Sequence, residues 1–164
     1  MIYIGITVAI LAIDLGIKYY VEHHRTHQQE DRILGDAILV RKSHNKGIAL
    51  NALDRHPLLV RGISVGMTAL MAIVALYLLF KKDSAPTSKG KKLGLAWLLG
   101  GALSNTYDRV FRGYVVDYFS FNVKWKKLRR VVFNIADLFI IVGSVIFSCF
   151  GASDASASRT VKKH

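Results

Sequence analysis

Two carboxylates stand in positions where they could do chemistry. Asp117 lies in YVVDYFSFNVKW, which alternates like a half-buried strand, and it has the parity of the apolar residues Phe119 and Phe121. Asp137 lies in an apolar run with no basic residue one helical turn away. Apolar surroundings raise a carboxyl pKa, and such groups are more often functional than structural. Two of them on one side of a membrane can share a proton and activate a water for attack on a peptide carbonyl, as an aspartic protease dyad does.

Other polar residues inside apolar segments form three clusters. Each cluster shares one helix face, because its members are three or four residues apart: Asp14 with Lys18, Asn105 with Asp108 and Arg109, and Asn134 with Asp137. Ionisable groups in apolar spans are costly and normally face a bundle interior or a wet cavity, so the clusters predict one shared site. For Asp14, Lys18 and Asp108 a structural role is favoured. Asp14 would form an ion pair with Lys18, and Asp108 would form one with Arg109 or Arg112.

The elements that must position these residues are four apolar runs of membrane-crossing length. They cover about residues 1–21, 58–80, 93–111 and 131–150. The sequence therefore predicts a mainly α membrane protein, residues 1–164 forming a single domain built as a four-transmembrane-helix bundle. Alternation of the helices places all three polar clusters on the same side of the membrane, whichever way the bundle is oriented. The dense basic residues of the short loop place 81–92 and the tail 151–164 in the cytoplasm and the loops 22–57 and 112–130 outside.

Small side chains recur every four residues on the third run, at Ala96, Gly100 and Ser104. This pattern allows a neighbouring membrane helix to approach closely. We therefore expect the third helix to be tightly packed.

Composition excludes several other classes. The chain has 164 residues, 52% of them hydrophobic, and a formal net charge of +12. Its basic residues flank apolar runs or fill the loops between them, so membrane lipid rather than nucleic acid is the expected partner. Cys149 is the only cysteine, which rules out a disulfide framework. The histidines of EHHRTH, His23, His24 and His27, lack an H-E-x-x-H pattern. There is no G-x-S-x-G elbow for a serine enzyme, because GISVG at residues 62–66 lies inside an apolar run and does not follow a strand. No metal and no cofactor are expected.

Taken together, the motifs resemble the lipoprotein signal peptidase family, also called signal peptidase II. The matching segments are DLGIK with Asp14 and Lys18, HNKGIAL with Asn45, Gly47 and Ala49, GGALSNTYDR followed by GYVVDY, and FNIAD. They occur in the family's order along nearly the whole chain. Ser104 stands where the family usually has Gly, and Leu50 where it usually has Phe.

The resemblance implies an aspartic endopeptidase of the bacterial cell membrane with its active site at the extracytoplasmic face. It would cleave prolipoproteins N-terminal to the diacylglyceryl-modified Cys, and act as a monomer inhibited by cyclic peptides such as globomycin. The implied roles are catalysis by Asp117 and Asp137, substrate binding by Asn45, Asn105, Arg109 and Asn134, and structural support by Asp14, Lys18 and Asp108. It also implies a small extracytoplasmic β-containing cradle, for which ILGDAILV, residues 33–40, is the plausible strand.

Two other classes of function compete with this one. A small ion- or proton-coupled transporter or channel subunit would use the buried carboxylates as a relay. A non-catalytic scaffold would use the basic loops to hold anionic lipid. A transporter predicts polar residues through the full membrane depth, whereas here they gather at one side. Cleavage of a lipidated substrate would separate the three.

Overall fold

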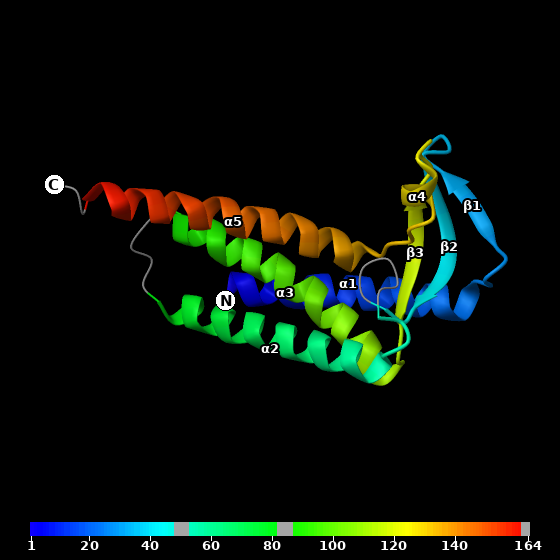
Figure 1. Cartoon of the computed structure of the whole chain (residues 1–164), viewed down its shortest axis with the longest axis horizontal. Helices are drawn as coiled ribbons and strands as arrows, with labels where there is room; N and C mark the ends of the chain where they lie inside the picture. The colour runs from blue at the N-terminus through cyan, green and yellow to red at the C-terminus, as the bar shows by residue number, and fades with distance from the viewer. Residues whose placement is uncertain (48–52, 82–86, 162–164) are drawn as a thin grey trace.

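Long helices and a small sheet at one end make up the molecule. The structure is a computed structural model that describes residues 1–47, 53–81 and 87–161. Its long helices are α1 (Ile2–His24), α2 (Pro57–Phe80), α3 (Thr87–Phe111) and α5 (Ile135–Val161), and α4 (Lys126–Arg129) is a single turn. Figure 1 shows the long helices side by side, with the sheet at one end and both chain termini away from it.

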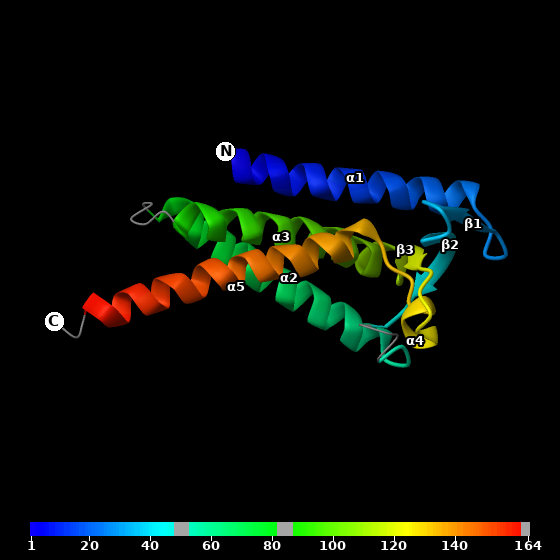
Figure 2. The same ribbon diagram turned by 90° about the horizontal axis from the view of Figure 1, so that it is seen from above.

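Three of the helices have the length and apolar composition of membrane spans. They are α1, α2 and the first part of α5, Ile135–Ala152. Within the described residues α3 does not qualify, because polar residues stand at both its ends. It is nevertheless the most buried helix, with eleven buried residues against two on α2. Figure 2 shows α3 running between α1 and α5, so the helix that hydropathy ranks lowest forms the centre of the bundle.

Glycines let α3 approach both neighbours at backbone contact. A Cβ at Gly100 would stand 2.9 Å from the Cβ of Ile10 on α1, as the small-residue ridge predicts. On the other side, a Cβ at Gly101 would stand 2.4 Å from the carbonyl oxygen of Ala136 on α5. Further along, Gly94 and Gly143 face each other in the same way, each with a backbone oxygen of the other within 3 Å of its missing Cβ. A side chain at these positions would push the helices apart.

The predicted ends of two helices were wrong. Helix α3 begins at Thr87, not near residue 93, so its first turns use the polar residues assigned to the loop 81–92. Helix α5 begins at Ile135, not near 131, and its backbone stays helical to Val161, into the segment predicted as a tail. Hydropathy marks the stretch that fits a bilayer, whereas hydrogen bonding and capping decide where a helix starts and stops.

Three antiparallel strands, in the order β1-β2-β3, form the sheet. They are β1 (Glu30–Ile33), β2 (Ile38–Asn45) and β3 (Val115–Phe121). A register irregularity between Val40 and Ser43 on β2 shifts the pairing, after which Ser43 pairs with Asp117 and Asn45 with Val115. The sheet thereby places the end of β2 beside the carboxylate on β3.

Residues 33–40 do not form the single strand that was predicted. They contain the turn between β1 and β2, where Leu34, Gly35 and Asp36 have φ values of 53°, 61° and 66°. Left-handed backbone is tolerated by Gly and Asp, and it reverses the chain. The hairpin explains why the apolar alternation of this segment is poor.

Strand β3 is also shorter and more enclosed than its alternation predicts. It ends at Phe121, so Val123 and Trp125 lie beyond it and are exposed. Tyr118 and Ser120, expected on a solvated face, are buried together with Asp117. Helices α1 and α3 pack on β3, and residue Phe133 pairs with Phe119 as an isolated bridge. Both faces of β3 are therefore covered around the carboxylate.

Candidate active site

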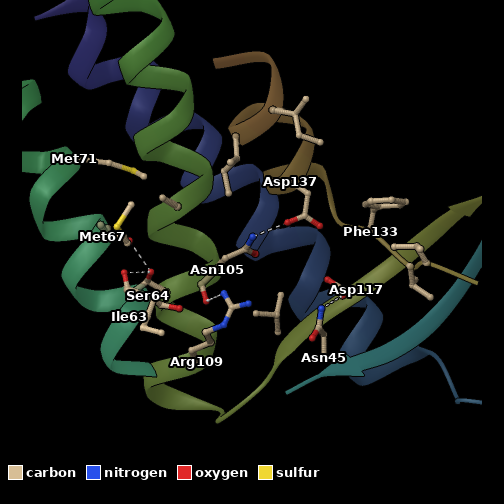
Figure 3. A pocket seen from close by; sticks show the side chains of 18 residues that line it. Asn45, Ile63, Ser64, Met67, Met71, Asn105, Arg109, Asp117, Phe133 and Asp137 are labelled. Atoms are coloured by element: carbon tan, nitrogen blue, oxygen red, sulfur yellow. Dashed lines mark hydrogen bonds between the residues drawn. The ribbon is translucent and has the colours of Figure 1, made fainter. Parts of the chain in front are cut away.

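A cavity of about 400 Å³ lies where the sheet meets the helices, and both candidate carboxylates line it. Figure 3 shows Asp117 reaching it from β3 and Asp137 from the start of α5, with Arg109 and Asn105 from α3 and Asn45 from β2. Most of the remaining wall is apolar, and its side chains from α2 and α5 include Ile63, Met67, Met71, Ile140 and Ile141. The cavity therefore joins a polar end to a hydrocarbon-lined side.

Two amides hold Asp117. Its Oδ2 accepts a hydrogen bond from Asn45 Nδ2 at 3.1 Å, and its Oδ1 accepts one from Asn134 Nδ2 at 2.7 Å. Only 2% of the residue is exposed. Burial and, next in size, the charge of Asp137 together raise the pKa of Asp117 to about 7, although the two amide hydrogen bonds act in the opposite direction. This carboxyl group therefore titrates near neutral pH.

Asp137 is fixed by the N-terminus of its own helix. Its Oδ2 accepts from the backbone N–H of Asn134 at 3.1 Å, and Asn134 Oδ1 accepts from the backbone N–H of Asp137 at 3.0 Å. This reciprocal pair is a capping box, built here from Asn and Asp. The other oxygen, Oδ1, accepts from Asn105 Nδ2 at 2.8 Å. The carboxylate is thus oriented by the helix start and by a neighbouring helix.

The amides that hold the carboxylates are themselves oriented by Lys18. Its ammonium can only donate, and it donates to Asn105 Oδ1 at 2.8 Å, so the NH₂ of Asn105 faces Asp137. The same Asn105 oxygen accepts from Asn134 Nδ2 at 3.2 Å. One buried cation on α1 therefore fixes the direction of the hydrogen bonds that end on both carboxylates.

Lys18 is balanced by two buried carboxylates. Asp14 Oδ2 lies 2.7 Å from its Nζ, and Asp108 Oδ2 lies 3.3 Å away; all three side chains are fully buried. The i, i+4 pair expected on α1 is therefore present. Of the two arginines weighed as partners of Asp108, Arg112 makes an ion pair at 3.0 Å. Asp108 also accepts from the backbone N–H of Val116, which ties α3 to β3.

Sequence reasoning missed two residues that complete this network. Tyr118 donates its hydroxyl to Asp14 Oδ1 at 3.0 Å and accepts from the backbone N–H of Ile135 at 2.9 Å. Ser104 donates to Asp14 Oδ2 at 2.5 Å and accepts from Lys18 at 3.1 Å. The departure from the family's usual Gly at Ser104 thus adds hydrogen bonds. A signal for Tyr118 was present in its position beside Asp117, but strand parity assigned it to solvent.

Arg109 lines the cavity beside the two carboxylates. Its Nη2 donates to the carbonyl oxygen of Gly47 at 3.0 Å, and its Nη1 donates to the carbonyl oxygen of Asn105, one turn earlier, at 3.4 Å. It makes no ion pair with Asp108, which lies on another side of α3. The guanidinium is therefore already engaged with peptide carbonyls at the edge of the cavity.

The structure brings all nine predicted site residues into one connected region. Of the N-x-G-x-A motif, Asn45 and Gly47 lie at the cavity, while Ala49 and the departure at Leu50 lie outside the described residues. The histidines lie elsewhere: His23 and His24 bond to the backbone carbonyls of Tyr19 and Tyr20. Polar residues of α2 also reach the cavity wall, and they include Ser64 and Thr68.

Two carboxylates and several amides line one cavity between long helices, three of which have the length and composition of membrane spans. A carboxylate pair in such a cavity has the groups needed to activate a water. A family model described as signal peptidase (SPase) II matches residues 6–151. Lipoprotein signal peptidases of Brucella ovis, Brucella abortus and Brucella melitensis are each 39% identical over 140 residues, which is 84% of this chain and 82% of theirs. The chain belongs to the signal peptidase II family, and it is a membrane protease of the aspartic class.

Solved structures agree on the fold. A bacterial membrane enzyme determined by the in meso method at 2.3 Å resolution is similar with a TM-score of 0.78 at 23% identity, covering 94% of this chain and 90% of that chain. A second, determined by the same method at 1.9 Å, gives a TM-score of 0.72 at 23% identity, with 90% of each chain covered. The arrangement of helices and sheet is therefore one already known for a membrane enzyme.

Proposed function

We propose that this protein cleaves prolipoproteins on the N-terminal side of the diacylglyceryl-modified Cys, with Asp117 and Asp137 as the catalytic pair. The observation that carries the proposal is that both carboxylates line one cavity and are held by a single chain of amides. The family membership and the names of the Brucella relatives support the substrate class.

The chemistry follows from a dyad that shares one proton. The ionised carboxylate takes a proton from a water molecule as the water oxygen attacks the scissile carbonyl carbon, and the protonated carboxyl gives its proton to the carbonyl oxygen. The tetrahedral intermediate then collapses, breaking the C–N bond, and the amine leaves with a proton returned from the dyad. A carboxyl that titrates near neutral pH, such as Asp117, suits a group that must both hold and release a proton.

Binding of the substrate backbone falls to donors beside the dyad. Arg109, which contacts the carbonyl of Gly47, has a planar fork able to hold carbonyl oxygens of an extended peptide. Asn45, Asn105 and Asn134 orient the carboxylates and present amide groups to the same cavity. The apolar wall of α2 and α5 suits the acyl chains, whose remote binding energy can be used for orientation.

The membrane arrangement is part of the proposal. We place α3 across the bilayer as a fourth span. The polar residues of its C-terminal end lie beside the two carboxylates, and its N-terminal end carries the basic residues of the segment 81–92. The sheet and the dyad then face the extracytoplasmic side of the bacterial cell membrane, and residues 81–92 face the cytoplasm. The enzyme works as a monomer in contact with membrane lipid, and cyclic-peptide inhibitors such as globomycin occupy the dyad cavity.

A gel-shift assay tests the function. A purified lipidated prolipoprotein is incubated with the wild-type protein and with Asp117→Asn, and release of the signal peptide is followed by mobility. The wild type should convert the substrate and the variant should not. If the wild type leaves the lipidated substrate intact, the proposal is wrong and a transporter or channel role for the buried carboxylates becomes the better explanation.

A further inference from the structure

A second cavity adjoins Asp117. It has a volume of about 220 Å³, and its polar lining consists of Ser43, Asn45, Asp117, Lys127 and Arg130. Asn45 and Asp117 line this cavity and also the larger one. Asp117 therefore stands in the wall between a cavity bordered by the helices and a cavity bordered by the sheet and the α4 turn.

The two cavities differ in chemistry. Ile63, Met67 and Ile141 are typical of the larger one. The smaller one has a hydroxyl, an amide, the carboxyl of Asp117 at its inner end and two cationic side chains, beside two valines. A hydrocarbon chain fits the first and is a poor match for the second. The smaller cavity suits a polar or anionic group instead.

Its two cations are available to a ligand. Lys127 and Arg130 are exposed, and neither has an anionic partner within residues 1–47, 53–81 and 87–152. The turn that carries them is held by backbone hydrogen bonds. Arg129 N–H donates to the carbonyl oxygen of Trp125 at 3.1 Å, and Val131 N–H donates to that of Leu128 at 3.1 Å. The turn thus presents two positive charges at the mouth of a cavity that ends on a catalytic carboxylate.

The cleavage reaction supplies a ligand of the right kind, if the proposed function holds. The substrate has two apolar parts, the signal peptide before the scissile bond and the acyl chains on the Cys after it. The mature chain that follows this Cys must leave toward water. We infer that the smaller cavity binds the first residues of the mature chain after the lipidated Cys, and that Lys127 and Arg130 make an acidic side chain favourable there. These two cations are specificity-determining residues, not catalytic ones.

The expected preference is modest and depends on salt. An exposed ion pair changes affinity by a factor of about two to five, and two such cations give about a tenfold preference for an acidic over a basic residue at low ionic strength. The preference shrinks in 0.5 M salt, because the Debye length falls to a few ångströms.

The experiment compares three lipidated substrates that differ only at the residue after the Cys, which is Asp, Asn or Lys. The ratio of kcat/KM for the Asp and Lys substrates is measured for the wild type and for Lys127→Glu/Arg130→Glu, at low and high salt. Lys124→Glu/Lys126→Glu is the matched control, because it makes the same charge change at exposed residues that line neither cavity.

The wild type and the control should favour the Asp substrate over the Lys substrate about tenfold, and the cavity variant should favour the Lys substrate. For the Asn substrate, kcat/KM of the cavity variant should differ from that of the wild type by less than about twofold. A wild-type ratio near one, or a ratio that the control shifts as much as the cavity variant, overturns the inference. The inference is also overturned if the cavity variant loses the same fraction of kcat/KM on all three substrates, and only in vesicles that contain anionic lipid. That result would assign Lys127 and Arg130 to binding a lipid headgroup. A wild type that cleaves none of the substrates contradicts the proposed function itself.

Discussion

The hydroxyl of Tyr118 joins three elements of the fold, so its removal should be costly. It lies on β3, donates to Asp14 on α1 at 3.0 Å and accepts from the first backbone N–H of α5, that of Ile135, at 2.9 Å. The side chain is buried, with 7% exposed. Tyr118→Phe keeps the ring and deletes both hydrogen bonds.

The size of the loss follows from what each partner retains. Asp14 keeps Lys18, Ser104 and the backbone N–H of Ala136, so it loses one charge-assisted bond among several. The N–H of Ile135 loses its acceptor in a half-buried position, which costs the lower end of about 1–3 kcal/mol by itself. We expect Tyr118→Phe to lower the free energy of unfolding by about 3–4 kcal/mol, or the melting temperature by about 6–16 °C.

The assay is thermal unfolding of the purified protein in detergent, with Tyr114→Phe as the control. Tyr114 also donates its hydroxyl to a carboxylate, Glu22, at 3.2 Å, but it lies in a half-buried position and holds no backbone N–H. The control should lose less than about 1 kcal/mol. Equal losses in the two variants would refute the role given to Tyr118 at the start of α5.

Four further outcomes follow from the site. Asp117→Asn and Asp137→Asn should each keep less than about a tenth of the cleavage rate with native circular dichroism; more activity than this would rule out the dyad. Because the folded pKa of Asp117 is raised from 3.8 to about 7, the native protein loses stability as pH rises through this interval, and Asp117→Asn should remove that loss; a pH-independent difference in melting temperature between variant and wild type would contradict it. Asp14→Ala and Lys18→Ala should each destabilise strongly, and the double variant by less than their sum; additive losses would show that the pair is uncoupled. Arg109→Lys should fold normally but lose more than twofold in kcat/KM on a lipidated substrate, since Lys lacks the planar fork; a smaller change would remove Arg109 from substrate binding.

The meeting of distant polar residues was predictable from the sequence. Alternation of long apolar runs puts Asp14, Asn105 and Asp137 at the same end of the bundle. The structure connects these residues by hydrogen bonds and an ion pair through Lys18 and Asn134. This inference needs no side-chain detail, because successive spans must cross the membrane in opposite directions. The family motifs added the roles, which remain predictions for each residue.

Local geometry was less predictable, for identifiable reasons. Asn134 and Asp137 were read as members of a site within a helix starting near 131, but they form the capping box that starts the helix at 135. Hydropathy also undervalued α3, since Ser104, Asn105 and Asp108 bond to Lys18 inside the bundle and glycines make its closest contacts with α1 and α5. The burial of Tyr118 depends on α1 and α3 covering β3, which strand parity cannot reveal.

The helices are packed unequally around the dyad cavity. Helices α3 and α5 touch backbone to backbone at Gly94, Gly101 and Gly143, so a shift of one against the other would disrupt close contacts. Helix α2 buries only Val60 and Thr68, packs chiefly on α3, and supplies the apolar wall of the dyad cavity opposite α5. Thr106 of α3 bonds to Thr68 and to the carbonyl oxygen of Ser64 on α2, so this lightly buried wall is still tied to the bundle. Under the proposed function, α2 is the wall past which a lipidated substrate would enter laterally from the bilayer, with its acyl chains never entering water.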